Sequence, residues 1–225
     1  MPRENLSRQI HHIQDEILLL GSMVEQAMLS AVDSLKRRDP KTAREIFEGD
    51  QLINDKRFAI ENAILILFAT QQPMAHDLRL LAAMLEINTE LERMGDYAKG
   101  IAKVVIKLEN VTIDIPMREL NHMAELAVGM LHRALSAFIT ENISQAMLIP
   151  RDDGEVDNLY DTIYHLLVNK MIEKPEMIDH TNLLMWVAHN LERMADRTTN
   201  ICERTVFIGT GELMEIETAD DDDVE

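Results

Sequence analysis

Acidic side chains one helical turn apart are the residues of this chain best suited to chemistry. Glu92 and Asp96 are four residues apart, and so are Glu192 and Asp196. On a helix this spacing turns the two carboxylates by about 40° around the axis, so both lie on one face and can share a cation. Carboxylate oxygens favour iron, manganese, magnesium or calcium, and zinc also accepts them. Each pair is therefore a candidate metal site.

Two further acids are candidate ligands because they lie next to the apolar stripe of their predicted helices. Asp50 precedes Ile53 by three residues, and Asp153 precedes Val156 by the same spacing. A partly buried carboxylate requires a partner, which is either a cation or a hydrogen-bond donor. Asp50 and Asp153 therefore join the two acidic pairs as candidate ligands.

An internal repeat distinguishes these acids from the many acidic pairs that composition alone produces. The segment Leu91-Glu-Arg-Met-Gly-Asp96 recurs 100 residues later as Leu191-Glu-Arg-Met-Ala-Asp196. Upstream, three further pairs align at a shift of 103 residues: Asp50 with Asp153, Ile53 with Val156, and Asn54 with Asp157. The chain is therefore interpreted as a duplicated unit. Asn54 carries no charge and is a weaker ligand than Asp157.

Prolines divide the chain into six predicted helical stretches, because a proline inside a helix loses a hydrogen bond and clashes with the preceding turn. The predicted helices span residues 5–37, 40–69, 74–109, 117–140, 143–172 (interrupted near Pro150) and 178–208. Asp39 and Asn142 have the type and position of N-caps. Apolar residues recur at alternating steps of four and three through residues 80–108 and 184–208, which is a heptad pattern.

Composition narrows the class of protein. Among 225 residues, 40 Asp and Glu against 22 Lys and Arg give a formal charge of -18, which argues against nucleic acid and against direct attachment to anionic lipid. Aromatic residues make up 4%, Gly and Pro are scarce, and Met is abundant, so helices are favoured over strands. The one cysteine, Cys202, suits a reducing cytosol. No signal sequence is recognised, and the longest apolar run, residues 63–69, is too short to cross a membrane.

Together these features predict an all-α protein made of two tandem three-helix bundles. The first bundle covers residues 1–110 and the second residues 111–214, with a pseudo-two-fold axis relating them. Residues 215–225, which end in Ala-Asp-Asp-Asp-Asp-Val-Glu, are predicted to be a short disordered acidic tail. Glu92 and Asp96 point about 140–180° away from the centre of the heptad seam, which predicts that they lie on the outer face of their bundle.

The sequence resembles the PhoU family of bacterial regulators of phosphate uptake. The residues that carry the resemblance are Leu67-Phe-Ala-Thr-Gln-Gln-Pro73, Asp77-Leu-Arg79, the two Leu-Glu-Arg-Met-x-Asp segments, Asn200-Ile-Cys-Glu203 and Gly211-Glu212. The resemblance implies two three-helix bundles and a cytoplasmic, non-enzymatic adaptor that holds phosphate-starvation genes off. The implied partners are a sensor histidine kinase and the ATPase subunit of the phosphate ABC transporter, and the membrane is reached only through them. A homodimer is expected because two-fold assemblies are the commonest.

The resemblance also implies metal sites. Some members of the family bind multinuclear iron or zinc clusters at surface Glu/Asp-x-x-x-Asp motifs, one cluster per bundle. The residues that match these motifs are Glu92, Asp96 and Asp50 in the first half, and Glu192, Asp196, Asp153 and Asp157 in the second. Magnesium, manganese and calcium stay open as occupants, and no organic cofactor is implied. Asn54 and Gly100 depart from the pattern of the second half and weaken the first site.

Three other interpretations compete with this one. The acids could form a network with Arg93 and Arg193 and serve structure alone. A carboxylate-bridged di-metal enzyme would place its acids in a buried site between helices, contrary to the outward direction of Glu92 and Asp96. The third interpretation is a PhoU-related accessory protein of a different phosphate permease. The sequence carries no phosphate-binding loop, dinucleotide fingerprint or nucleophile elbow.

Overall fold

The structure, a computed structural model, describes residues 2–216 and is helical throughout its regular elements. The α-helices are α1 (Pro2–Arg37), α2 (Pro40–Thr70), α3 (His76–Lys107), α4 (Met117–Ile139), α5 (Ile143–Ala146), α6 (Asp153–Glu173) and α7 (Ile178–Thr210). Short 3₁₀ turns at Ile149–Asp152 and Pro175–Met177 lead into α6 and α7. No strand occurs in the described part of the chain. The all-α prediction is therefore confirmed.

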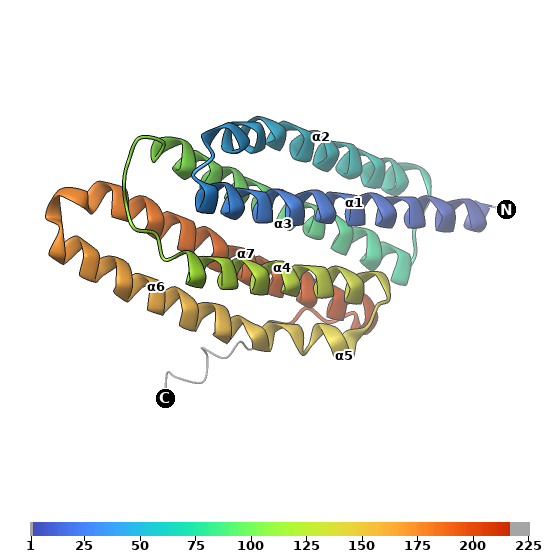
Figure 1. The fold of residues 1–225 in the computed structure, drawn as a ribbon. Helices are drawn as coiled ribbons and strands as arrows, with labels where there is room; N and C mark the ends of the chain where they lie inside the picture. The colour runs from blue at the N-terminus through green and yellow to red at the C-terminus, as the bar shows by residue number, and fades with distance from the viewer. Residues whose placement is uncertain (1, 217–225) are drawn as a thin grey trace.

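The helices form two bundles that lie side by side along their length (Figure 1). In the first, α1, α2 and α3 pack against one another, and in the second α4, α6 and α7 do so. The bundles meet where α3 packs along α7 and α1 packs on α4, and the buried apolar side chains of both form one continuous cluster. The predicted tandem bundles are present, and they share a core at their junction.

Local sequence signals explain where several helices begin. The Asp39 carboxylate accepts hydrogen bonds from the backbone N–H groups of Lys41 and Thr42, at 3.0 and 3.1 Å, and so caps α2. The Asn142 side chain accepts one from the Gln145 N–H at 3.1 Å and caps α5. The break predicted near Pro150 is the 3₁₀ turn between α5 and α6. These N-caps and this interruption confirm the predictions made from the sequence.

Equivalent positions of the two halves have equivalent burial, as a true duplication requires. Asp50 and Asp153 are each only 4% exposed, and the paired seam residues are buried in both halves. Two differences between the halves compensate each other. In the first half Gly95 lies beside Ile53, and a methyl group at Gly95 would be 3.0 Å from the Ile53 side chain. In the second half the aligned residues are Ala195, which has the methyl group, and the smaller Val156.

The pseudo-two-fold axis runs between α3 and α7. Tyr97 and Arg197 are equivalent residues, 100 positions apart, and the Arg197 Nε donates a hydrogen bond to the Tyr97 hydroxyl at 3.1 Å. Residues related by a two-fold axis can touch each other only near that axis. Gly100 lies in the same region, since a Cβ there would be 2.9 Å from the Asn190 amide nitrogen. The glycine thus makes room for an asparagine of the other half.

Among the described residues, one helix has the length and mean hydropathy of a membrane span. The segment Glu4–Arg37 of α1 passes this test, and 44% of its most apolar window is buried inside the molecule. Its inward side chains, including Ile17, Leu20 and Val24, are fully buried against the neighbouring helices. A core helix passes the same test of length and hydropathy, and the burial of these side chains is that of a core helix.

Residues 211–216, which follow α7, are ordered. Gly211, with φ of 80°, ends α7 in the left-handed conformation that glycine adopts most readily. Ile216 is 8% exposed, and its backbone N–H donates to the Glu203 carboxylate at 3.0 Å. Order therefore extends at least two residues into the segment predicted as a tail. Residues 217–225 of that predicted tail lie outside the described residues.

Candidate functional site

Each bundle carries its candidate acids on one outer helix and one central helix. In the first half Asp50 lies on α2, and Glu92 and Asp96 lie on α3; we call these three residues the first acidic face. In the second half the candidates lie on α6 and α7, and we call them the second acidic face: Asp153, Asp157, Glu192 and Asp196. The fold therefore places each set where two neighbouring helices of one bundle pack together.

A lysine neutralises part of the first acidic face. The Lys99 Nζ donates to the Asp50 carboxylate at 2.6 Å and lies 3.9 Å from the Asp96 carboxylate. The Asn54 amide donates to the same Asp50 oxygen at 2.9 Å. The hydrogen bond to Asp50 is the main reason that the pKa of Lys99 is raised above its ordinary value. The partner that a buried Asp50 requires is thus an ammonium group of the chain itself.

The other two acids of this face retain unfavourable charge. Burial raises the pKa of Glu92, and the nearby carboxylate of Asp96 raises it further. Burial also raises the pKa of Asp96, followed by the charge of Asp50, while Lys99 acts in the opposite direction. Because a raised carboxylate pKa means that ionisation is costly in the folded state, this face gains from any cation that approaches it.

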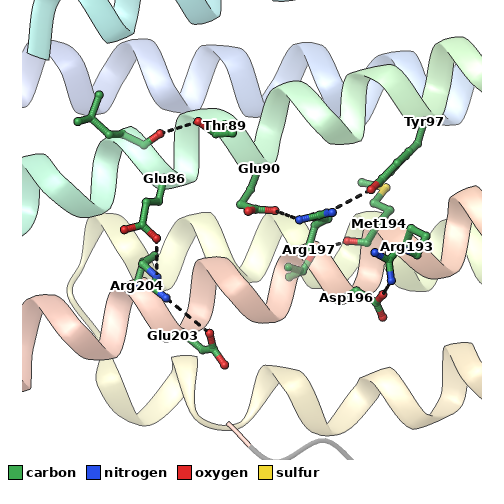
Figure 2. Close-up of polar contacts among 12 residues, drawn as sticks. Glu86, Thr89, Glu90, Tyr97, Arg193, Met194, Asp196, Arg197, Glu203 and Arg204 are labelled. Carbon is green, nitrogen blue, oxygen red and sulfur yellow. Dashed lines mark hydrogen bonds and ion pairs between the residues drawn. The ribbon is translucent and has the colours of Figure 1, made fainter. Parts of the chain in front are cut away.

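The second acidic face has different partners. Glu192 lies 3.3 Å from the Nδ1 of His189, one turn earlier on α7. The Arg193 guanidinium pairs with Asp196 at 2.9 Å, as Figure 2 shows. Burial nevertheless raises the pKa of Asp196, and the neighbouring arginines offset only part of the effect. Arg193 makes the contact expected of an acid–arginine network, whereas His189 places an imidazole nitrogen beside Glu192, which sequence reasoning missed.

The side chains as placed do not form a finished metal centre. Within residues 2–216, no group of three or more His, Cys, Asp or Glu side chains is gathered in the way that holding a metal ion requires. Cys202 offers no thiolate ligand at neutral pH, because burial raises the pKa of its thiol to about 12. The structure therefore brings the predicted acids to shared faces, and metal binding stays a prediction.

A second polar cluster joins the two halves and was missed from the sequence (Figure 2). Arg197 on α7 contacts Glu90 on α3 at 3.2 Å in addition to Tyr97. Further along, Arg204 pairs with Glu86 of α3 at 3.1 Å. Arg197 and Glu90 are 17% and 15% exposed, so this pair is largely shielded from solvent. It connects the helices that carry the two acidic faces.

Comparison with known proteins gives a consistent result. The family model described as "PhoU domain" matches twice, over residues 17–105 and 120–205. A phosphate-specific transport system accessory protein PhoU homolog of Clostridium acetobutylicum is 32% identical over 217 residues, which is 96% of this chain and 99% of the relative.

Two solved structures resemble the whole fold. The crystal structure of the phosphate transport system regulatory protein PhoU from Streptococcus pneumoniae gives a TM-score of 0.86 at 32% identity, covering 93% of this chain and 99% of that one. PhoU from Pseudomonas aeruginosa gives a TM-score of 0.86 at 29% identity, covering 92% and 99%. The two family matches coincide with the two bundles, so the similarity extends over both acidic faces.

Proposed function

The chain belongs to the PhoU family, and on that basis we propose that it is a regulatory accessory protein of a phosphate-specific transport system. The observation that carries this proposal is similarity over nearly the full length of relatives named as accessory and regulatory proteins. Because this chain spans 99% of those relatives, the role proposed is that of the whole protein.

The proposed mechanism is that of a cytoplasmic adaptor rather than an enzyme. In it the protein links the ATPase subunit of the phosphate ABC transporter to a sensor histidine kinase and represses phosphate-starvation genes when phosphate is plentiful. The state of the transporter changes which partner is engaged, which requires different affinities for the two states of a partner. The adaptor acts as a homodimer, the commonest closed assembly. It reaches the membrane through its partners, since its charge of -18 opposes direct contact with anionic lipid.

The acidic faces are the proposed contact surfaces. Burial raises the pKa of Glu92, Asp96 and Asp196, so these carboxylates are held charged at a cost. A basic surface on a partner, or a bound cation, would lower that cost by Coulomb attraction in a partly desolvated site. This supports a surface whose affinity depends on charge.

The donor sets of the two faces differ in how well they suit the metal clusters of the family. The second acidic face offers four carboxylates with the imidazole of His189 beside one of them, a mixed set that suits iron or zinc, while magnesium, manganese and calcium suit its oxygens. The first acidic face does not suit a metal cluster, because the ammonium of Lys99 already binds the carboxylate of Asp50. A bound metal would supply positive charge that draws these carboxylates together. We therefore propose metal binding at Asp153, Asp157, Glu192 and Asp196.

Replacing Glu192 and Asp196 together by alanine is the test of this surface. We expect binding to the cytoplasmic part of the kinase, measured by titration with purified protein, to weaken about tenfold or more, because a charged contact at an interface contributes about 1.5 kcal/mol or more. Metal content of protein purified without chelator should fall in the same variant.

A matched control removes the same charge elsewhere. Glu173→Ala with Glu176→Ala takes two exposed carboxylates from the end of the second bundle, about four helical turns from Glu192. This variant should bind the kinase as the unaltered protein does. Unchanged affinity and unchanged kinase activity with the Glu192 and Asp196 variant would remove the second acidic face from the mechanism.

A further inference from the structure

We propose that Lys99 is a built-in cation that replaces a metal at Asp50 of the first acidic face, so that the two halves of the duplicated protein have diverged: the chain itself supplies the cation at Asp50, whereas the second face, with a threonine at the aligned position, takes up a cation from solution. The part of this inference that concerns the second acidic face rests on the proposed function. The part that concerns Lys99 depends only on contacts within the chain.

The geometry at Asp50 carries the proposal. Asp50 is 4% exposed, and its carboxylate accepts from the Lys99 ammonium at 2.6 Å and from the Asn54 amide at 2.9 Å. The Lys99 ammonium also lies 5.6 Å from the centre of the Phe47 ring, within range of a cation–π attraction. The Asp50 carboxylate and the Phe47 ring thus hold the Lys99 ammonium where a metal ion would have to bind Asp50, and the Asn54 amide occupies the same carboxylate oxygen.

The aligned positions of the second half carry neither the amide nor the ammonium that bind Asp50. Asn54 aligns with Asp157, which adds a carboxylate in place of an amide, and Lys99 aligns with Thr199, which carries no charge. The first face therefore combines three carboxylates with the Lys99 ammonium, whereas the second combines four carboxylates with the Arg193 guanidinium, which pairs with Asp196 on the same helix. The substitutions act in the same direction, because each makes the second face more negative than the first.

An unpaired hydroxyl at the second face is an independent sign of a missing partner. Thr199 is 7% exposed, and its Oγ1 has no hydrogen-bond partner among the described residues. Thr199 follows Asp196 by three residues and Glu192 by seven, so it lies on the same side of α7 as both acids. A buried hydroxyl without a partner costs free energy unless a ligand or water completes it. The first face has no such gap, because Lys99 stands there and is bonded.

The test compares Lys99→Thr with Lys103→Thr, which removes an exposed lysine from the same helix. In metal-free buffer at pH 7 we expect Lys99→Thr to lower the unfolding midpoint by about 4 °C, because the buried Asp50 carboxylate loses its charged partner, and Lys103→Thr to change it little. Equal midpoints for the two variants at pH 7 would overturn the proposal.

A second measurement uses Zn²⁺ alone as the probe. Glu192→Ala with Asp196→Ala should remove Zn²⁺ uptake, and adding Lys99→Thr to this variant should restore uptake at the first face. Zn²⁺ uptake that survives in the double variant and disappears on adding Asp50→Asn would show a metal beside Lys99 and overturn the proposal. If the unaltered protein takes up no Zn²⁺, the proposed metal site of the second face fails, and the pH 7 stability loss of Lys99→Thr alone decides for or against the built-in cation.

Discussion

Leu191→Ala is expected to lower the free energy of unfolding by about 2–5 kcal/mol, and Leu91→Ala by a similar amount. Both leucines are fully buried and occupy equivalent positions of the repeat, and each directly precedes the glutamate of one acidic face. The cost combines lost burial of the side chain with the cavity that remains. Urea unfolding followed by far-UV circular dichroism measures it. Leu52→Ala, at a position 64% exposed, is the control and should change stability little.

The shape of the unfolding curve tests how the two bundles are related. Because α3 packs along α7 and the buried side chains of both bundles form one cluster, we expect a single transition in each variant. If Leu191→Ala instead gave two separate transitions, with the first half unfolding as it does in the unaltered protein, the bundles would be independent domains and the shared core would be contradicted.

Arg197→Met is expected to lower the free energy of unfolding by about 2–3 kcal/mol. The change leaves Glu90 charged in a site that is only 15% exposed and removes the donor to the Tyr97 hydroxyl. Breaking one partner of a fully buried ion pair costs about 3–5 kcal/mol, and the partial exposure of this pair reduces that figure. Thermal and urea unfolding of the purified variant measure the loss.

A double-mutant cycle with Glu90→Gln separates the ion pair from the packing of the arginine stem. The double variant should be more stable than the sum of the two single effects predicts, because it leaves no unpaired charge. Arg118→Met, which removes an exposed arginine from α4, is the control and should have little effect. Additive effects of Glu90→Gln and Arg197→Met would show that this pair does not hold the bundles together.

Much of the fold could be predicted from the sequence because its signals are local or repeated. The heptad pattern through Leu91 and Leu191, the cap at Asp39 and the break at Pro150 each act within a few residues, and the structure confirms them. The repeat supplied the long-range information, since two copies of one bundle that share a seam are expected to meet about a two-fold axis.

The contacts between the bundles could not be predicted in the same way. Glu90 and Arg197 are 107 residues apart, and neither departs from the pattern of an exposed charged helix face. Only the packing of α3 on α7 makes them partners. The contact between Tyr97 and Arg197 was open to prediction in principle, since both stand at the same position of the repeat, close to where the axis must pass.

The burial of two candidate acids was predicted from the sequence, whereas the basic side chains beside the acids were missed. Asp50 and Asp153 are buried as their spacing from the apolar stripe indicates. Lys99 and His189 were overlooked because a lone basic residue near acids usually faces solvent. Their signal was the alignment of the halves, in which Lys99 stands opposite a threonine and His189 opposite Thr89. Comparing the halves for differences, as well as identities, would have found both residues.

The proposed regulation is tested most directly by phosphate-starvation gene expression in cells that naturally carry the gene for this protein. A reporter fused to a starvation promoter should be active at high phosphate in cells that lack the gene, repressed again when the gene is restored, and active when the restored copy carries Glu192→Ala with Asp196→Ala at normal protein levels. A reporter that stays repressed at high phosphate in cells without the gene would contradict the central claim that this protein regulates the response to phosphate.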